Sequence, residues 1–366
     1  MWSLYRLLPH PFLILVVFLG AATSAVWALT LPKPSGPYTV GYRHAELTDA
    51  GRKDPFDPTH ERTLKLTLYY PSNDAYTQES YGMENVLFWT RALQEPLSSH
   101  DITAAEARSV IHDIAALNVY KTLNAGSAKG PFPVIIFEHG FGVTADSYHL
   151  LLQDLVSHGY IVIAPAHPFI ADVVIFNNGT RAFLKAERDA LAIDTVYADA
   201  RFVLDQLGVL KKHLPQMDLS RVGMMGHSLG GIATMKMARG KGIKAAVQLD
   251  APLGKDMEGL SLDSGSDFSI PFLHLFAADN PSGGRDTIHL GRNNEKVIID
   301  RIDHNAFADH GLLKEIISVF VKKKWHLGAG HAIFSSYHPS ITQLIRTFFD
   351  KFLGDKSFNN QAFQAK

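Results

Sequence analysis

Six short apolar runs, separated by longer stretches of helix-forming residues, fill most of the chain after residue 130 and restrict its possible folds most strongly. The runs lack the apolar–polar alternation of a strand with one wet face, so we expect strands buried on both faces. Alternating strands and helices are typical of parallel β-α units. The pattern therefore predicts one doubly wound α/β domain, with a mostly parallel sheet, over residues 33–366. The six runs are PVIIFEHG (133–140), YIVIAPAH (160–167), RVGMMGHS (221–228), KAAVQLDA (244–251), PFLHLFAAD (271–279) and EKVIIDRIDH (295–304).

Residues 76–130 interrupt this regular pattern. They follow TLKLTLYYPS (63–72), whose alternation predicts an early antiparallel strand. Within the interruption, Thr103 is followed three residues later by Glu106, which is the capping-box signature of a helix start. We expect a helical, cap-like insertion over one end of the sheet.

The same insertion contains the apolar cluster VLFW (86–89). Its aromatic residues Phe88 and Trp89 allow two functional interpretations: they line an acyl pocket, or they dock the protein on a lipid surface. Packing in the core is the structural alternative.

Residues 1–28 have the layout of an export signal. Arg6 precedes the apolar run 12–22, and the small residues Ala25 and Ala28 offer cleavage points. The whole apolar stretch of about 20 residues is also nearly long enough to cross a bilayer. We expect a cleaved signal peptide or an N-terminal membrane anchor, and a buried N-terminal helix is the remaining alternative. Both leading options export the mature domain, so that it is periplasmic or secreted, and the second anchors it to a membrane.

Composition excludes several function classes. Lys and Arg number 35 against 36 Asp and Glu, so no charge excess favours nucleic acid or a strongly anionic membrane as the main partner. The chain has no cysteine, which excludes disulfides, thiolate metal sites and lipid attachment through an N-terminal cysteine. A small neutral substrate fits this composition better.

A candidate nucleophile stands in the pattern G-x-S-x-G. Ser228 lies between Gly226 and Gly230, where the strand-like run RVGMM (221–225) meets the helix-like run GGIATMKMAR (230–239). This motif carries chemistry only at a strand-turn-helix junction, where glycines allow close backbone approach and the hydroxyl projects at the carboxyl edge of the sheet. The context predicts a nucleophilic serine rather than an incidental serine in a glycine-rich turn.

A serine nucleophile needs an imidazole to take its proton and a carboxylate to orient that imidazole. His304 follows the last apolar run, and two aspartates, Asp250 and Asp279, follow successive runs before it. The sequence alone leaves both aspartates open as the acid, and the other would cap a turn. We expect His227 to be structural, with its side chain pointing away from that of Ser228.

The oxyanion of an acyl-transfer intermediate needs two backbone N–H donors. The residue after the nucleophile, Leu229, supplies one in this motif. The segment FEHGFGVTADSY (137–148) offers the second: Gly140 and Gly142 let the loop turn inward, which makes Phe141 the candidate donor. An ordinary strand-to-helix turn is the alternative. Such a site implies no metal and no cofactor.

Several motifs together resemble a known family. In order and rough spacing, the chain resembles the plasma and intracellular type II platelet-activating factor acetylhydrolases and their bacterial α/β-hydrolase relatives, over roughly residues 36–353. The resemblance is strong at the motifs and weak over residues 76–130 and 168–200. The motifs are GPYTVG, LYYPS, HGFG, LVSHGYIV, GHSLGG, LDAPLG and HNAFAD.

The resemblance implies an α/β-hydrolase fold and a calcium-independent serine esterase that removes short or oxidised acyl groups from phospholipids. It favours Asp250 as the acid and supports Phe141 and Leu229 as oxyanion donors. The stretch AADN at Asp279 departs from the family and resembles the acid loop of bacterial cutinase-like and polyester hydrolases. Alternatives are therefore a cutinase-like enzyme, a general lipase or a polyester hydrolase, and a non-catalytic binding protein on a hydrolase scaffold. The expected partner is a small-molecule or lipid ester, with association to a lipid surface.

Overall fold

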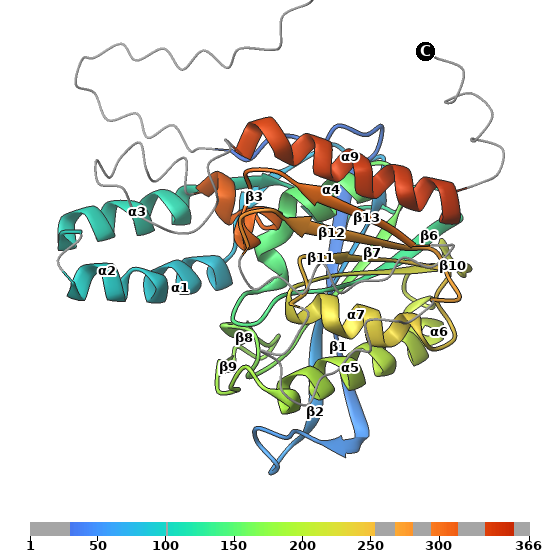
Figure 1. The fold of residues 1–366 in the computed structure, drawn as a ribbon, viewed down its shortest axis with the longest axis horizontal. Coiled ribbons are helices and arrows are strands. Elements are labelled where there is room, and N and C mark those ends of the chain that lie inside the picture. Colours follow the sequence, from blue (N-terminus) through green and yellow to red (C-terminus); the bar gives the residue numbers. More distant parts are fainter. Residues whose placement is uncertain (1–29, 100–101, 253–267, 281–293, 314–333, 355–366) are drawn as a thin grey trace, which may run out of the picture.

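One large β-sheet organises the part of the chain that the computed structural model describes, namely residues 30–99, 102–252, 268–280, 294–313 and 334–354. Within these residues the strand order is β13-β12-β11-β10-β6-β7-β2-β1-β5 (Figure 1). The strands are β1 (Thr39–Lys53), β2 (Glu61–Ser72), β5 (Thr122–Leu123), β6 (Phe132–Glu138), β7 (Ile161–Ala166), β10 (Met217–His227), β11 (Ala245–Leu249), β12 (Phe272–Ala277) and β13 (Asn294–Ile299).

The six apolar runs form β6, β7 and β10 to β13, and these strands pair in parallel. β2 is antiparallel to both of its neighbours, β1 and β7. The prediction of a mostly parallel, doubly wound sheet is confirmed. From β6 the chain passes to β7 on one side and later returns as β10 on the other side. The carboxyl ends of β6 and β10 thus border a topological switch point, where sheets of this kind bind ligands.

Helices cover both faces of the sheet (Figure 1). All seven residues of β6 are buried: Ile135 and Phe137 pack in one apolar cluster, and Val134 and Ile136 pack in the other. Successive side chains of a strand point to opposite faces, so two covered faces require an unbroken apolar run. One layer contains α4 (His149–Ser157) and α9 (Phe334–Leu353), and the other contains α5 (Ala190–Asp205), α6 (Leu207–Leu210) and α7 (Leu229–Ala238).

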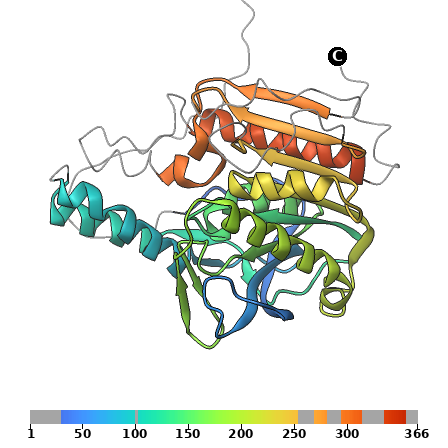
Figure 2. The ribbon, with the colours of Figure 1, turned by 60° about the horizontal axis from the view of Figure 1, so that its bottom comes forward.

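The helical insertion extends to one side of these layers (Figure 2). The predicted capping box is present, because the Thr103 side chain accepts from the Glu106 amide and the Glu106 carboxylate accepts from the Thr103 amide. α1 contacts η1 (Ala145–Tyr148) and β8 (Val173–Ile175), which follow the carboxyl ends of β6 and β7. The insertion therefore lies at the carboxyl edge. Its elements are β3 (Gln78–Ser80), α1 (Met83–Ala92), α2 (Gln94–Ser98), α3 (Ala104–Ala116) and β4 (Asn118–Tyr120).

The stretch 182–210 is rich in helix-forming residues, yet its first two residues belong to a hairpin. β9 (Arg181–Phe183) pairs antiparallel with β8, and Gly179 in the connecting turn has φ 84°. An Asn-Gly turn between short apolar segments is a strong hairpin signal, and helix propensity does not overcome it. The helix α5 begins at Ala190, after the N-cap Asp189.

The predicted signal or anchor, residues 1–28, lies outside the described residues. In the described ranges, no helix combines the length and apolar character needed to span a bilayer.

Candidate active site

Ser228 stands at the junction between β10 and α7, with φ 55° and ψ −118°. This backbone conformation is rare for a residue with a side chain and is typical of strained functional positions. A Cβ added to Gly226 would lie 2.2 Å from the carbonyl oxygen of Gly230. A Cβ on Gly230 would lie 2.2 Å from the carbonyl oxygen of Glu138. Both motif glycines are thus required by close backbone approach at a strand-turn-helix junction.

Three side chains from separate loops form a hydrogen-bonded chain. Ser228 Oγ donates to His304 Nε2 at 2.8 Å, and His304 Nδ1 donates to Asp250 Oδ2 at 2.7 Å. Ser228 follows β10, Asp250 follows β11, and His304 begins the 3₁₀ helix η3 (His304–Phe307) after β13. Parallel strands end at one edge of the sheet, so residues 76 and 54 positions apart meet there.

The carboxylate of Asp250 is buried, with 1% of the residue exposed, and it has two further donors. The Ala277 amide donates to Oδ1 at 3.0 Å, and the Asn280 side-chain amide donates to Oδ2 at 2.5 Å. Asp279 has an exposed side chain, and the imidazole of His304 is hydrogen-bonded to Asp250 instead. Sequence reasoning missed Asn280, although the stretch AADN already set it apart.

The two candidate oxyanion donors lie near the strand-turn-helix junction at Ser228. Leu229 is the first residue of α7, and Phe141 lies in the loop after β6. The amides on both sides of Phe141 are engaged: Gly140 donates to the Tyr148 hydroxyl at 3.3 Å, and Gly142 donates to the Ile170 carbonyl at 3.0 Å. Within the described residues, the amides of Phe141 and Leu229 donate to no group.

His227 lies beside the hydrogen-bonded chain of Ser228, His304 and Asp250, and it is buried. Its Nδ1 is 2.8 Å from the Tyr148 hydroxyl, and its Nε2 is 2.9 Å from the backbone carbonyl oxygen of His304. Burial and the neighbouring His304 lower the pKa of His227 well below its usual range. The expectation of a structural role did not foresee this contact with His304.

A buried ionic cluster includes Glu138, three residues before Phe141. His167 bridges two carboxylates: its Nε2 is 2.6 Å from Glu138 Oε2 and its Nδ1 is 2.8 Å from Asp199 Oδ2. Arg62 donates to Asp199 at 2.7 Å and to Asp54 at 2.8 Å. Burial lowers the pKa of His167, but the two carboxylates outweigh it and raise this pKa to about 9. Sequence reasoning missed the cluster, although Glu138, a charged residue at the end of the apolar strand β6, was a signal.

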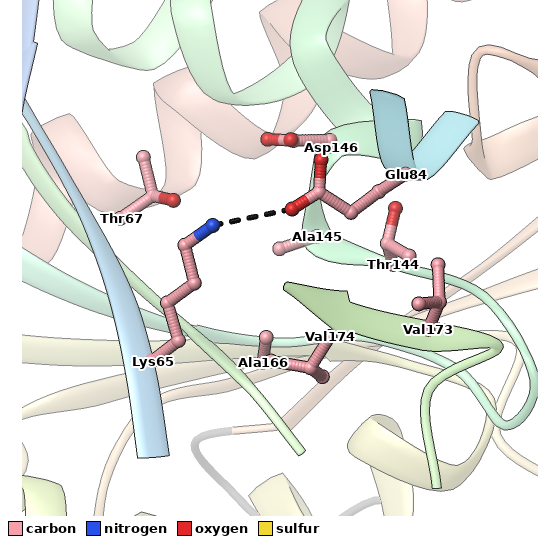
Figure 3. A pocket seen from close by; sticks show the side chains of 9 residues that line it. All are labelled: Lys65, Thr67, Glu84, Thr144, Ala145, Asp146, Ala166, Val173 and Val174. Carbon is pink, nitrogen blue, oxygen red and sulfur yellow. Dashed lines mark hydrogen bonds and ion pairs between the residues drawn. The ribbon is translucent and has the colours of Figure 1, made fainter. Parts of the chain in front are cut away.

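A small pocket with polar and apolar walls opens between β2, α1 and η1 (Figure 3). Lys65 reaches across it to Glu84, with Nζ 3.2 Å from Oε1. Thr144 and Asp146 line the pocket on the same side as Glu84. Its volume of about 20 Å³ holds one water-sized molecule and no acyl chain. Ser228, Asp250 and His304 are not among the residues that line this pocket. In the described ranges, no group of three His, Cys, Asp or Glu side chains suits a metal ion.

The aromatic pair of the insertion packs against the histidine loop. Trp89 is 2% exposed and belongs to the apolar core, whereas Phe88 is half-buried. The Phe88 ring stacks on the ring of His310, with centroids 4.6 Å apart, and Trp89 meets the same ring edge-on. For Trp89, this burial favours packing over the lipid-surface and acyl-pocket interpretations.

Comparisons with known proteins agree with this architecture. The chlorophyllase family model matches residues 121–263. A probable 1-alkyl-2-acetylglycerophosphocholine esterase of Arthroderma benhamiae is 30% identical over 245 residues, covering 64% of this chain and 62% of the relative. The platelet-activating factor acetylhydrolase of Cavia porcellus is 23% identical, covering 62% and 57%. The solved ferulic acid esterase of Streptomyces cinnamoneus aligns with a TM-score of 0.67 at 22% identity, covering 89% of this chain and 93% of that one. The chain has the α/β-hydrolase fold.

The resemblance of this chain to platelet-activating factor acetylhydrolases, predicted from its motifs, is confirmed. The chain spans 62% and 57% of the lengths of these two relatives. The chlorophyllase match includes Phe141, Ser228 and Asp250, and it ends before His304.

Proposed function

We propose that this chain hydrolyses carboxylic esters through an acyl-enzyme on Ser228. Ser228 Oγ attacks the ester carbonyl carbon while His304 Nε2 takes the hydroxyl proton. His304 returns this proton to the alcohol as the ester bond breaks. Water, deprotonated by His304, then attacks the acyl-enzyme; the bond from the acyl carbon to Ser228 Oγ breaks, His304 returns the proton to Ser228, and the acid is released. Asp250 keeps the imidazole in one tautomer and stabilises its charged form, and no step uses a metal or a cofactor.

The observation that carries the proposal is the pair of hydrogen bonds from Ser228 to His304 (2.8 Å) and from His304 to Asp250 (2.7 Å). The unengaged amides of Phe141 and Leu229 support a role as the two donors to the oxyanion of the tetrahedral intermediate. A non-catalytic scaffold protein has no need of a strained serine with φ 55°.

For the substrate, we propose phospholipids with a short or oxidised acyl group. The supporting finding is the 30% identity to a protein named for hydrolysis of 1-alkyl-2-acetylglycerophosphocholine. We also propose that the domain is exported, periplasmic or secreted, and contacts a lipid surface, because residues 1–28 have the pattern of a signal or an anchor.

A cutinase-like enzyme, general lipase or polyester hydrolase is the second candidate. The observation that favours it is Asn280, which resembles the acid loop of those enzymes in sequence and donates to the acid Asp250. A chain-length series of nitrophenyl esters, run beside a short-acyl phospholipid, separates the two. Preference for the phospholipid supports the first candidate, and activity that rises with acyl length on simple esters supports the second.

Covalent labelling tests the reaction type. A fluorophosphonate probe should label the wild-type protein once, on Ser228, and Ser228→Ala should abolish labelling. The same variant should lower kcat by roughly 10⁴-fold to 10⁶-fold with the fold intact. Ser220→Ala, which removes an exposed hydroxyl near the start of β10, is the matched control and should behave as wild type. Near wild-type turnover by Ser228→Ala would refute the proposed function.

A further inference from the structure

We infer that Tyr148 and His227 are positioning residues that tie the loop of the base His304 to the loop of the oxyanion donor Phe141. The inference rests on the proposed function, because it assigns a task within the reaction at Ser228. Among the described residues, neither side chain hydrogen-bonds to Ser228 Oγ or to the ring nitrogens of His304. Their task is to keep the spacing between base and oxyanion hole.

The hydrogen bonds along this tie run in a single direction. His227 Nε2 is 2.9 Å from the carbonyl oxygen of His304, and a carbonyl only accepts, so Nε2 carries the proton. His227 Nδ1 then accepts from the Tyr148 hydroxyl at 2.8 Å. The Tyr148 oxygen in turn accepts from the Gly140 amide at 3.3 Å. Both ring nitrogens of His227 and the hydroxyl of Tyr148 thus have partners of the correct type.

Burial makes this tie stiff and selective. Tyr148 is fully buried and His227 is 3% exposed, so water cannot replace a missing partner. A neutral imidazole has one donor and one acceptor, which is what the tie requires, and the lowered pKa of His227 agrees with that state. The ring centroids of His227 and His304 are 4.6 Å apart, so packing also holds the two imidazoles together.

The tie connects the groups whose mutual position matters for acyl transfer. Gly140 directly precedes Phe141, and His227 directly precedes Ser228. A Cβ on Gly140 would lie 3.2 Å from His227 Nδ1 and 3.3 Å from Ser228 Cβ, so the oxyanion loop lies against the strand-turn-helix junction. Displacement of one loop therefore changes the geometry of the other.

A second set of hydrogen bonds, formed by Asp309, joins the same two segments. The Tyr148–His227 tie therefore affects their alignment more than their attachment. Asp309, five residues after His304, accepts from the amides of His149 and Leu150 at 2.8 Å and 3.1 Å. The Asp309 amide donates to the carbonyl of Ser147, next to Tyr148. Loss of the Tyr148 hydroxyl should therefore leave the loops attached but less exactly aligned.

Tyr148→Phe and His227→Phe should lower kcat with little change in KM, because substrate binding does not use the tie. A misalignment of about 1 Å costs on the order of 10²-fold in rate, so we expect losses of about tenfold for Tyr148→Phe and up to about a hundredfold for His227→Phe. The double variant should be no slower than His227→Phe, since both changes break one chain. His227→Gln, whose amide can donate to the His304 carbonyl, should recover part of the loss.

The experiment measures kcat and KM on a small soluble nitrophenyl ester, per active site titrated with a fluorophosphonate, together with Tm. Tyr160→Phe is the matched control: it removes another buried hydroxyl, bonded to Asp350 in α9, and should leave kcat per site unchanged. Lowered kcat per site in the tie variants, with partial rescue by His227→Gln, supports the inference.

Two outcomes overturn the inference, and they differ from each other. If the wild type is labelled and the tie variants lose only Tm at unchanged kcat per site, the residues are structural and the proposed function stands. If the wild type is not labelled and Ser228→Ala retains turnover, the proposed function fails and the inference fails with it.

Discussion

Asp250 illustrates, at the scale of single residues, how the site selects one carboxylate from two. Its buried carboxylate accepts hydrogen bonds from His304, Asn280 and the Ala277 amide. These donors hold the carboxylate in one orientation. Asp279, which follows the next strand, β12, is exposed.

Exchange of each acid for its amide should separate the two candidates. Asp250→Asn should lower kcat by on the order of 10⁴-fold, because it removes the charge that supports the imidazolium and favours the wrong tautomer. Asp279→Asn is the matched control and should stay within about twofold of wild type. Steady-state kinetics on one small ester check both variants, and the reverse ranking would move the acid to Asp279.

The element that adds most to the bare fold is the helical insertion. α1 places Trp89 in the core and Phe88 on the ring of His310, six positions after the proposed base. Met83, on the same helix, is 54% exposed. The insertion therefore supports the histidine loop through α1 and has other residues at its surface.

Substitutions along α1 should distinguish the residues that pack in the core from those at the surface. Trp89→Ala should lower the free energy of unfolding by about 3–5 kcal/mol, because it opens a cavity in the core. It should also reduce activity on a small soluble ester and on vesicle-bound phospholipid to the same extent. Thermal unfolding and paired kinetics measure the two effects. Met83→Ser, the matched control, should leave Tm unchanged.

A selective rise of KM for vesicle-bound substrate in Trp89→Ala, with Tm preserved, would contradict this view. It would restore the substrate-facing interpretation of the aromatic pair. Phe88→Ser addresses the half-buried neighbour in the same assay, and a substrate-selective effect confined to Phe88 would place the acyl group beside His310.

At the scale of the whole molecule, the buried ionic cluster joins distant parts of the fold. Arg62 comes from β2, Glu138 from β6, Asp199 from α5, and His167 follows β7. The Coulomb attraction compensates for desolvation only while every member stays charged, and removing one partner leaves an unpaired buried charge. The stability of the fold should therefore depend on the protonation of His167.

The sign of this dependence follows from the raised pKa. The folded pKa of His167 is about 9, above the unfolded value of about 6.5, so its contribution is complete below about pH 6.5 and is lost as pH rises through 9. This loss is on the order of 3 kcal/mol. Urea unfolding of wild type and His167→Gln between pH 6 and pH 10 measures it. At pH 6 the variant should be less stable than wild type. The difference between their free energies of unfolding should shrink as the pH rises. A difference independent of pH would mean that His167 is neutral in the folded protein.

Local sequence patterns determined the parts of this protein that depend on neighbours along the chain. The apolar runs specified the parallel strands, because a strand covered on both faces needs an apolar side chain at every position. Thr103 and Glu106 marked a helix start, because a capping box is completed within one turn. Gly226, Ser228 and Gly230 marked the strand-turn-helix junction, because the motif lies within five consecutive residues and the crowding at Gly226 comes from Gly230.

Tertiary structure decided which of several suitable side chains meet. Asp250 and Asp279 both follow strands, and their burial and partners separate them only once the fold brings Asp250 to His304, 54 positions away. The contact of His227 with Tyr148, 79 positions away, is equally invisible in the sequence. Hydrogen bonds act over about 3 Å and specify no sequence distance. Local composition can therefore name the candidates at a sheet edge, and only the folded chain can pair them.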